Sequence, residues 1–172
     1  AIAIDISPHA ITLLRSQSTP TQTFTPNRIT TFVGDFSKPD IFEIKEEEER
    51  VDIKEGSITA ATLIFTLSAI PPTSHLQTLK NLRSRLKFGG VVCFRDYGIY
   101  DLTYFRFPFD QWEGGLTFRR QDRTLTTFFE IGGEEGEISG AEVGGDGPCY
   151  SNFERVWVEA GFEVLECEYA TV

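Results

Sequence analysis

The sequence predicts an α/β fold whose sheet consists mainly of parallel strands. Short apolar runs that suit buried strands alternate with segments whose apolar residues have helical spacing. The longest apolar run, residues 58–70, is β-branched at several positions and stops at Pro71 and Pro72, as expected of a central buried strand. Two earlier runs each end in an aspartate, Asp5 and Asp35. In such sheets, ligands bind at the carboxyl ends of the strands.

The order of elements follows from periodicity and from residues typical of helix ends. Ser7 is expected to cap a first helix with Pro8 at its first position, and Ser74 to cap a second that ends at Gly89 or Gly90. The expected helices span residues 7–17, 74–90 and 151–162. The expected strands span residues 1–7, 29–35, 58–70, 91–97 and 163–172, with a strand or hairpin at 114–130.

Length and composition favour one globular domain over residues 1–172, because 172 residues with 40% hydrophobic side chains can bury a core. The net charge of −10 comes from two stretches, residues 43–55 with a net charge of −4 and residues 130–146 with −6. We interpret 43–57 as a charged insert and 130–148 as an acidic, Gly-rich, low-complexity insert. The acidic balance therefore does not argue against a nucleic-acid partner.

The chain shows no apolar run of 18 residues and no secretory signal, so no membrane partner is expected. Its three cysteines, Cys93, Cys149 and Cys167, are an odd number without metal-ligand spacing. We interpret them as reduced thiols and expect no metal. This composition favours a cytoplasmic location and leaves a nuclear or mitochondrial one open.

Charged and phenolic side chains follow directly on the apolar run at residues 91–94. Arg95, Asp96, Tyr97, Tyr100 and Asp101 gather where that strand is expected to end. This makes the strand end a candidate site. The alternative is that Arg95 and Asp96 form a structural ion pair.

Asp5 and Asp35 permit two interpretations. A carboxylate at the end of an early strand can accept both hydroxyls of a ribose, and two such acceptors at one edge would orient a nucleoside. Alternatively, each aspartate only caps the following turn or helix. The repetition favours the nucleoside.

Several stretches together resemble the class I S-adenosylmethionine-dependent methyltransferases, and more specifically the enzymes that make 3-methylcytidine in tRNA anticodon loops. They are IDISPHAI at 4–11, GDFS at 34–37, TLIFTLSAIPP at 62–72, LKFGGVVCFRDYGIYDL at 86–102, RF at 106–107 and RRQDRTLTTFF at 119–129. The resemblance implies a Rossmann-like class I methyltransferase sheet with S-adenosyl-L-methionine as cofactor. It implies that Asp5 holds the ribose, that Asp35 and Phe36 surround the adenine, and that Ile64 lines the methionine side.

The resemblance also implies roles around the acceptor base. The residues expected to be catalytic are Asp96, Tyr97 and Asp101, and those expected to bind substrate are Arg95, Arg106, Arg120 and Asp122. Methyl transfer to a ring nitrogen needs positioning, and a nearby carboxylate stabilises the positive charge that develops on the base.

The chain departs from the family at two places. Arg123 stands where the family usually has glycine, which is expected to change a tight turn. The chain has no methionine, opens at Ala1 inside an expected strand, and lacks the Gly-rich turn of the family's first strand. We therefore expect a fold that is incomplete at its N-terminus, a fragment of a longer enzyme.

The expected function is methyl transfer from S-adenosylmethionine to N3 of cytidine in the tRNA anticodon loop. The alternatives are a methyltransferase with another substrate, and a non-catalytic, degenerate domain that serves as an interaction module. The expected partner is tRNA. An aminoacyl-tRNA synthetase is a further candidate, because some members of the family work with seryl-tRNA synthetase.

Overall fold

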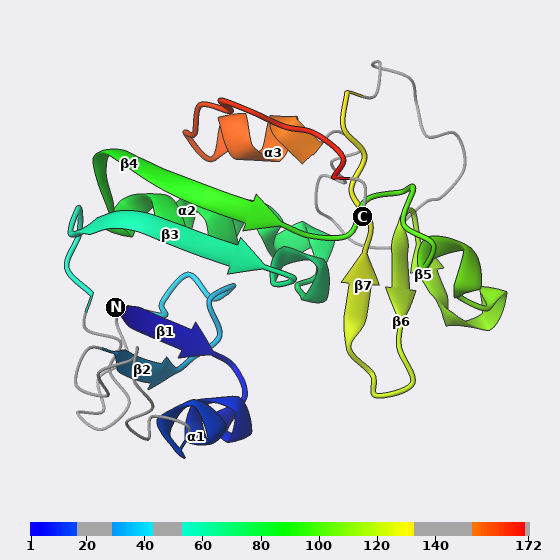
Figure 1. Ribbon diagram of the computed structural model, residues 1–172, viewed down its shortest axis with the longest axis horizontal. Coiled ribbons are helices and arrows are strands. Elements are labelled where there is room, and N and C mark those ends of the chain that lie inside the picture. The colour runs from blue at the N-terminus through cyan, green and yellow to red at the C-terminus, as the bar shows by residue number, and fades with distance from the viewer. Residues whose placement is uncertain (17–28, 43–52, 133–152, 171–172) are drawn as a thin grey trace. The chain divides into compact units, whose positions relative to one another are not determined.

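The computed structural model describes residues 1–16, 29–42, 53–132 and 153–170 (Figure 1). The chain divides into two compact units, residues 1–54 and 55–172. Most of the two inserts expected at 43–57 and 130–148 lies outside the described residues.

The first unit contains a parallel strand pair. Strand β1 (Ile2–Asp5) pairs with β2 (Thr30–Val33), with Ile2 opposite Thr30 and Asp5 opposite Val33. Both strands lie inside the predicted ranges. The backbone N–H of Gly34 donates to the carbonyl of Asp5 at 3.0 Å, so the pairing continues to the carboxyl ends of both strands.

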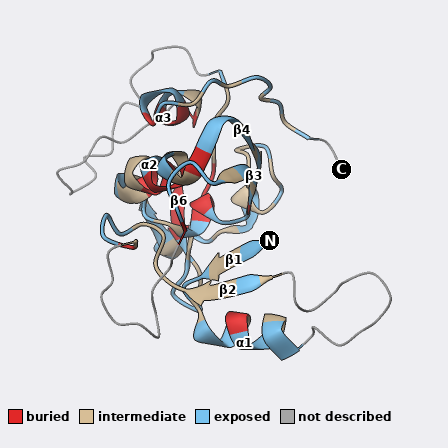
Figure 2. Ribbon diagram, turned by 90° about the vertical axis from the view of Figure 1, so that its left-hand side faces the viewer, coloured by how far each residue is buried: buried red, intermediate tan, exposed pale blue. Residues whose placement is uncertain are grey.

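Helix α1 (Pro8–Ser16) follows β1 as predicted. The hydroxyl of Ser7 accepts the N–H of Ala10 at 3.2 Å, which confirms Ser7 as the N-cap. Ile11 is 2% exposed and forms the buried face of the helix (Figure 2). This apolar contact holds α1 against the strand pair.

The second unit is built on another parallel pair, β3 (Ile58–Ile64) with β4 (Leu86–Arg95). Ile64 lies opposite Arg95, so both strands end at the same edge. The prediction of a strand continuing to residue 70 is wrong. Phe65 has a φ of +50°, which leaves the extended conformation, and the chain then enters a 3-10 turn at Leu67–Ala69.

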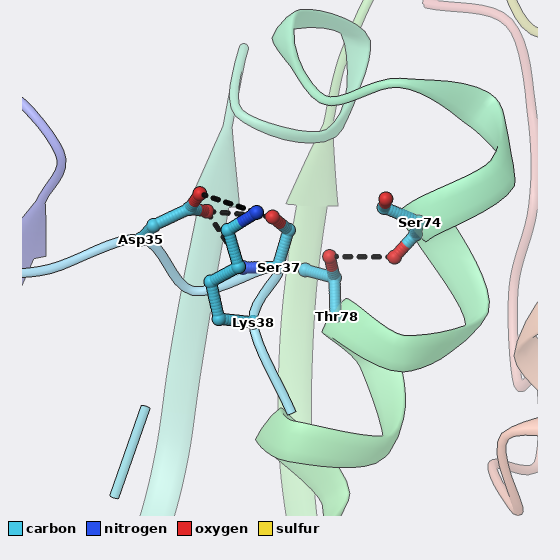
Figure 3. A network of polar contacts seen from close by, with 5 residues as sticks. All are labelled: Asp35, Ser37, Lys38, Ser74 and Thr78. Carbon is cyan, nitrogen blue, oxygen red and sulfur yellow. Dashed lines mark hydrogen bonds and ion pairs between the residues drawn. The ribbon is translucent and has the colours of Figure 1, made fainter. Parts of the chain in front are cut away.

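A second 3-10 turn (Pro72–Ser74) leads into helix α2 (His75–Arg85). Ser74 was expected to cap this helix, but its side chain makes no capping bond; its carbonyl instead accepts the hydroxyl of Thr78 at 2.8 Å (Figure 3). The expected end at Gly89 or Gly90 is also wrong, because Leu86 already has an extended conformation and begins β4. Gly89, with a φ of +72°, lies within the strand.

The hairpin expected at 114–130 is confirmed as a three-stranded antiparallel sheet. It contains β5 (Trp112–Gly114), β6 (Thr117–Arg119) and β7 (Leu125–Thr127), in that order. Two short 3-10 turns, Tyr104–Arg106 and Phe109–Gln111, precede it.

Helix α3 (Phe153–Glu159) lies within the predicted range and packs against α2. The strand expected at 163–172 is not formed in its described part, residues 163–170. The side chain of Tyr169 instead connects this segment to residues 98 and 131 of the second unit. Its hydroxyl accepts the N–H of Ile131 at 2.8 Å, and its ring lies so close to Gly98 that an added Cβ would come within 2.8 Å of it.

Aromatic rings join the elements of the second unit. The ring of Phe94, on β4, lies 4.8 Å from that of Phe153, 5.4 Å from Trp157 and 5.8 Å from Phe129. These packed rings cover one face of β4 with α3 and fix the strand that leads to the candidate site.

None of the helices in the described part of the chain is both long and apolar enough to cross a bilayer.

The buried His75 predicts a loss of stability in mild acid. Its Nε2 lies 2.9 Å from the carbonyl of Ile70, and burial lowers its pKa from 6.5 to about 4. Since the unfolded state binds the proton more readily, the free energy of unfolding is expected to fall by about 2–3 kcal/mol as the pH drops from 7 to 4.5. Urea unfolding of the full-length protein across this range measures the effect. His75→Gln should flatten the dependence and the exposed His9→Gln should not; equal slopes in all three proteins would contradict the assignment.

Arg123 predicts a gain in stability on substitution by glycine. Its φ is +71°, in the left-handed region that favours glycine, the residue that is usual at this position in the family that the sequence resembles. Arg123→Gly should raise the free energy of unfolding by about 0.5–1 kcal/mol, because relief of strain exceeds the extra entropy of the unfolded chain. Thermal unfolding measures this change, with Gln121→Gly as the control expected to destabilise. A lower midpoint for Arg123→Gly would show that the arginine side chain stabilises the turn.

Candidate functional site

The carboxylate of Asp96 ties the end of β4 to the turn that follows β3. Its Oδ2 accepts the N–H of Ser68 at 3.0 Å, and its Oδ1 accepts the N–H of Tyr97 at 3.0 Å. Burial raises the pKa of this carboxyl, while the bonds from Ser68 and Tyr97 act against that rise. A negative charge is therefore held in a partly desolvated place at the edge of the strand pair.

Tyr97 and Arg120 form the second part of this edge. The Arg120 guanidinium donates through Nη2 to the Tyr97 hydroxyl at 3.0 Å and through Nε to the Thr126 hydroxyl at 2.7 Å. Its carbon Cζ also lies 5.6 Å from the centre of the Tyr97 ring. The hairpin β6–β7 thus orients Arg120 toward the end of β4.

Phe65 is a member of this group that sequence reasoning did not identify. Its ring lies 4.8 Å from the Tyr97 ring, and the guanidinium of Arg95 lies 6.0 Å from its centre. The sequence signal was limited to its place inside the apolar run 58–70, since a positive φ is not expected of phenylalanine.

The predicted catalytic Asp101 and the predicted substrate-binding Asp122 each hold a turn of their own. Oδ1 of Asp101 accepts the N–H and the hydroxyl of Thr103, at 2.7 and 2.5 Å. Oδ1 of Asp122 accepts the same two groups of Thr124, at 3.0 and 2.6 Å. These bonds lower the pKa of both carboxyls. Their roles beside a base stay predictions.

The arginines predicted to bind substrate occupy different surroundings. Arg95 is the last residue of β4 and is exposed. Arg106 is exposed at the end of the 3-10 turn Tyr104–Arg106, and its charge adds to the lowering of the Asp101 pKa. Arg120, by contrast, is half-buried in the contacts with Tyr97.

In the first unit, the strand pair brings Asp5 and Asp35 to one edge. Asp5 ends β1 and pairs with Val33 of β2, and Asp35 lies two residues beyond Val33. Oδ1 of Asp5 accepts the N–H of Ser7 at 2.7 Å. Asp5 is exposed, so a ligand can approach its carboxylate.

Asp35 is bound more tightly to its own turn. Its Oδ1 accepts the N–H and the hydroxyl of Ser37 at 3.0 and 2.6 Å, and Oδ2 lies 3.9 Å from the ammonium of Lys38 (Figure 3). Both aspartates therefore cap turns, which was the alternative to the nucleoside role. The ring of Phe36 packs edge-on against Phe42 at 5.8 Å and is half-buried.

Ile64 is the remaining residue that was expected to contact the cofactor. Ile64 ends β3 in the second unit and is 58% exposed, which leaves an apolar surface at the strand end. Among the residues that the structure describes, no group of three histidine, cysteine or acidic side chains is arranged to hold a metal ion.

Three curated proteins that match the chain are described as methyltransferases acting on N3 of cytidine in tRNA. The chain is 35% identical over 128 residues to the mouse tRNA N(3)-cytidine methyltransferase METTL2, a match that covers 74% of this chain and 30% of that protein. It is 34% identical over 128 residues to the tRNA N(3)-methylcytidine methyltransferase trm141 of Schizosaccharomyces pombe, a match that covers 73% of this chain and 47% of that protein. The chain is 33% identical over 129 residues to the human tRNA N(3)-cytidine methyltransferase METTL6, a match that covers 75% of this chain and 41% of that protein. The matches thus span between 30% and 47% of the length of these relatives.

A solved structure supports the fold. The crystal structure of a SAM-dependent methyltransferase from Methanosarcina mazei matches with a TM-score of 0.53 at 19% identity, covering 74% of this chain and 61% of that one. No protein-family model matches the chain. The Rossmann-like methyltransferase fold predicted from the sequence is therefore confirmed, and the chain is a relative of the tRNA N(3)-cytidine methyltransferases.

Proposed function

We propose that the full-length protein transfers a methyl group from S-adenosyl-L-methionine to N3 of cytidine in the anticodon loop of tRNA. The observation that carries this proposal is the identity of 33–35% to three tRNA N3-cytidine methyltransferases over about three quarters of the chain. The polar edge at the end of β4 supports it, because that is where an acceptor base would be held in such a fold.

In the proposed reaction, Asp96 stabilises the positive charge that develops on the base. Cytidine N3 has a free lone pair, so attack on an electrophilic methyl group needs no strong base, but the product base is cationic. A carboxylate fixed by two N–H donors, from Ser68 and Tyr97, stabilises that charge without reorganising. Partial burial strengthens this interaction by excluding water.

The residues proposed for the cofactor fit an adenosyl group in their chemistry. Asp5 offers an exposed carboxylate to ribose hydroxyls, and Phe36 offers a half-buried ring to adenine. Asp35 would act beside them through the turn it holds, and Ile64 offers an exposed apolar surface to the methionine chain. When bound, S-adenosylmethionine supplies the electrophilic methyl group.

We propose tRNA as the partner, contacted by the exposed Arg95 and Arg106 and by Arg120 and Asp122 near the base. An aminoacyl-tRNA synthetase is a second proposed partner, which addition of seryl-tRNA synthetase to the assay tests. The proposed location is cytoplasmic, which fractionation of cells that make the full-length protein tests.

The function is tested by incubating the full-length protein with tRNA and isotope-labelled S-adenosylmethionine, followed by mass spectrometry of the nucleosides. Labelled 3-methylcytidine is the expected product. Label in DNA, protein or a small acceptor instead would favour a methyltransferase with another substrate. Absence of label despite soluble, folded protein would favour the interaction module.

Asp96→Asn is expected to lower the rate constant of methyl transfer about 100-fold, because it removes the negative charge opposite the developing cation. Single-turnover kinetics on tRNA measures this rate. The dissociation constant for S-adenosylmethionine should stay within a few-fold of the wild-type value.

The exposed Asp110→Asn is the matched control and should leave the rate unchanged. A rate for Asp96→Asn within threefold of wild type would exclude the electrostatic role. A parallel loss of thermal stability and cofactor affinity would show that the carboxylate mainly holds the turn at Ser68.

A further inference from the structure

Phe65 has an unusual backbone conformation. Its φ of +50° lies in the left-handed region, which a bulky side chain adopts only when its surroundings impose it. The N–H of Phe65 donates to the carbonyl of Arg95 at 2.8 Å, so the residue is fixed at the last step of the β3–β4 ladder. The strained conformation and this bond hold the ring in place at the edge where both strands end.

The ring of Phe65 offers aromatic surface that Tyr97 lacks. Tyr97 is half-buried, and its ring already contacts Phe65 at 4.8 Å, Phe128 at 5.8 Å and the guanidinium of Arg120 at 5.6 Å. Phe65 instead is 46% exposed. Of the two rings, that of Phe65 therefore has the surface on which a base can stack.

Positive charges lie next to this exposed ring. The guanidinium of Arg95 is 6.0 Å from its centre, and the guanidinium of Arg120 is bonded to the hydroxyl of the neighbouring Tyr97. An aromatic surface beside arginines is the combination by which proteins bind unpaired nucleotides, because the ring stacks on the base and the cations attract the phosphates.

We propose that Phe65 is the residue on which the acceptor cytosine stacks, with Tyr97 packed against its ring and Arg120 bonded to the hydroxyl of Tyr97. This inference rests on the proposed function, since it concerns the base that is methylated. It assigns to Phe65 a role in base binding that is separate from the charge stabilisation proposed for Asp96.

The test uses the full-length protein and an anticodon stem-loop RNA in which each loop cytidine in turn is replaced by a fluorescent cytidine analogue. Stacking on an aromatic ring quenches such an analogue, so wild-type protein should quench one position on binding. Phe65→Leu should abolish that quenching and weaken RNA binding about 5- to 150-fold, the range expected when one base–aromatic stack is lost. Phe65→Tyr should retain both.

Phe88→Leu is the matched control, because Phe88 is 97% exposed near the beginning of β4, away from the strand end. Quenching and affinity equal to wild type in Phe65→Leu would overturn the inference. Wild-type RNA affinity of Phe65→Leu, combined with lower thermal stability and cofactor affinity, would also overturn it. The ring would then pack against another polypeptide segment and not against RNA.

A separate methylation assay on unmodified tRNA distinguishes this inference from the proposed function. A wild-type protein that quenches the analogue but transfers no methyl group would refute the proposed function and support base stacking by Phe65. A wild-type protein that makes 3-methylcytidine at the same rate as Phe65→Leu would support the function and refute the inference.

Discussion

The half-buried carboxylate of Asp96 is the interaction on which the candidate site depends. It joins two backbone N–H groups, from Ser68 in the turn after β3 and from Tyr97 after β4. Parallel strands leave their last carbonyl and amide groups without ladder partners, and a carboxylate at this point satisfies two of the donors. The same bonds that close the strand ends also fix a negative charge there, so structural and chemical roles fall on one side chain.

Aromatic packing fixes the position of the end of β4 relative to α3 and to the hairpin β6–β7. On β4, Phe94 packs on Phe153 and Trp157 of α3, and Phe129 contacts both Phe94 and Phe153. The backbone N–H of Phe129 also donates to the carbonyl of Tyr97 at 2.8 Å. The hairpin that supplies Arg120 is therefore attached to the strand end by both apolar and backbone contacts, and rotation of one against the other would expose large rings.

Two residues other than glycine adopt left-handed backbone conformations in the described part of the chain, Phe65 and Arg123. Both are near the polar edge: one begins the turn after β3, and the other shapes the loop between β6 and β7 that follows Arg120. Such conformations cost free energy and persist only where neighbouring contacts impose them. At Phe65 the strain orients an exposed ring, whereas at Arg123 it preserves a turn that glycine would form without cost.

The sequence by itself determined the alternating elements, the Ser7 cap, the hairpin and the polar cluster after residue 94, because periodicity, capping and turn preferences are local. It also carried the family motifs. Tertiary structure alone decided where β3 stops, that Leu86 begins a strand, and that residues 163–170 are held by Tyr169 rather than by pairing. It also decided which polar residues meet: Asp96, Tyr97 and Arg120 are linked, whereas Asp101 and Asp122 hold their own turns. The bonds of Asp96 to Ser68, of Arg120 to Tyr97 and of Ile131 to Tyr169 join residues far apart in the chain, which no local pattern encodes.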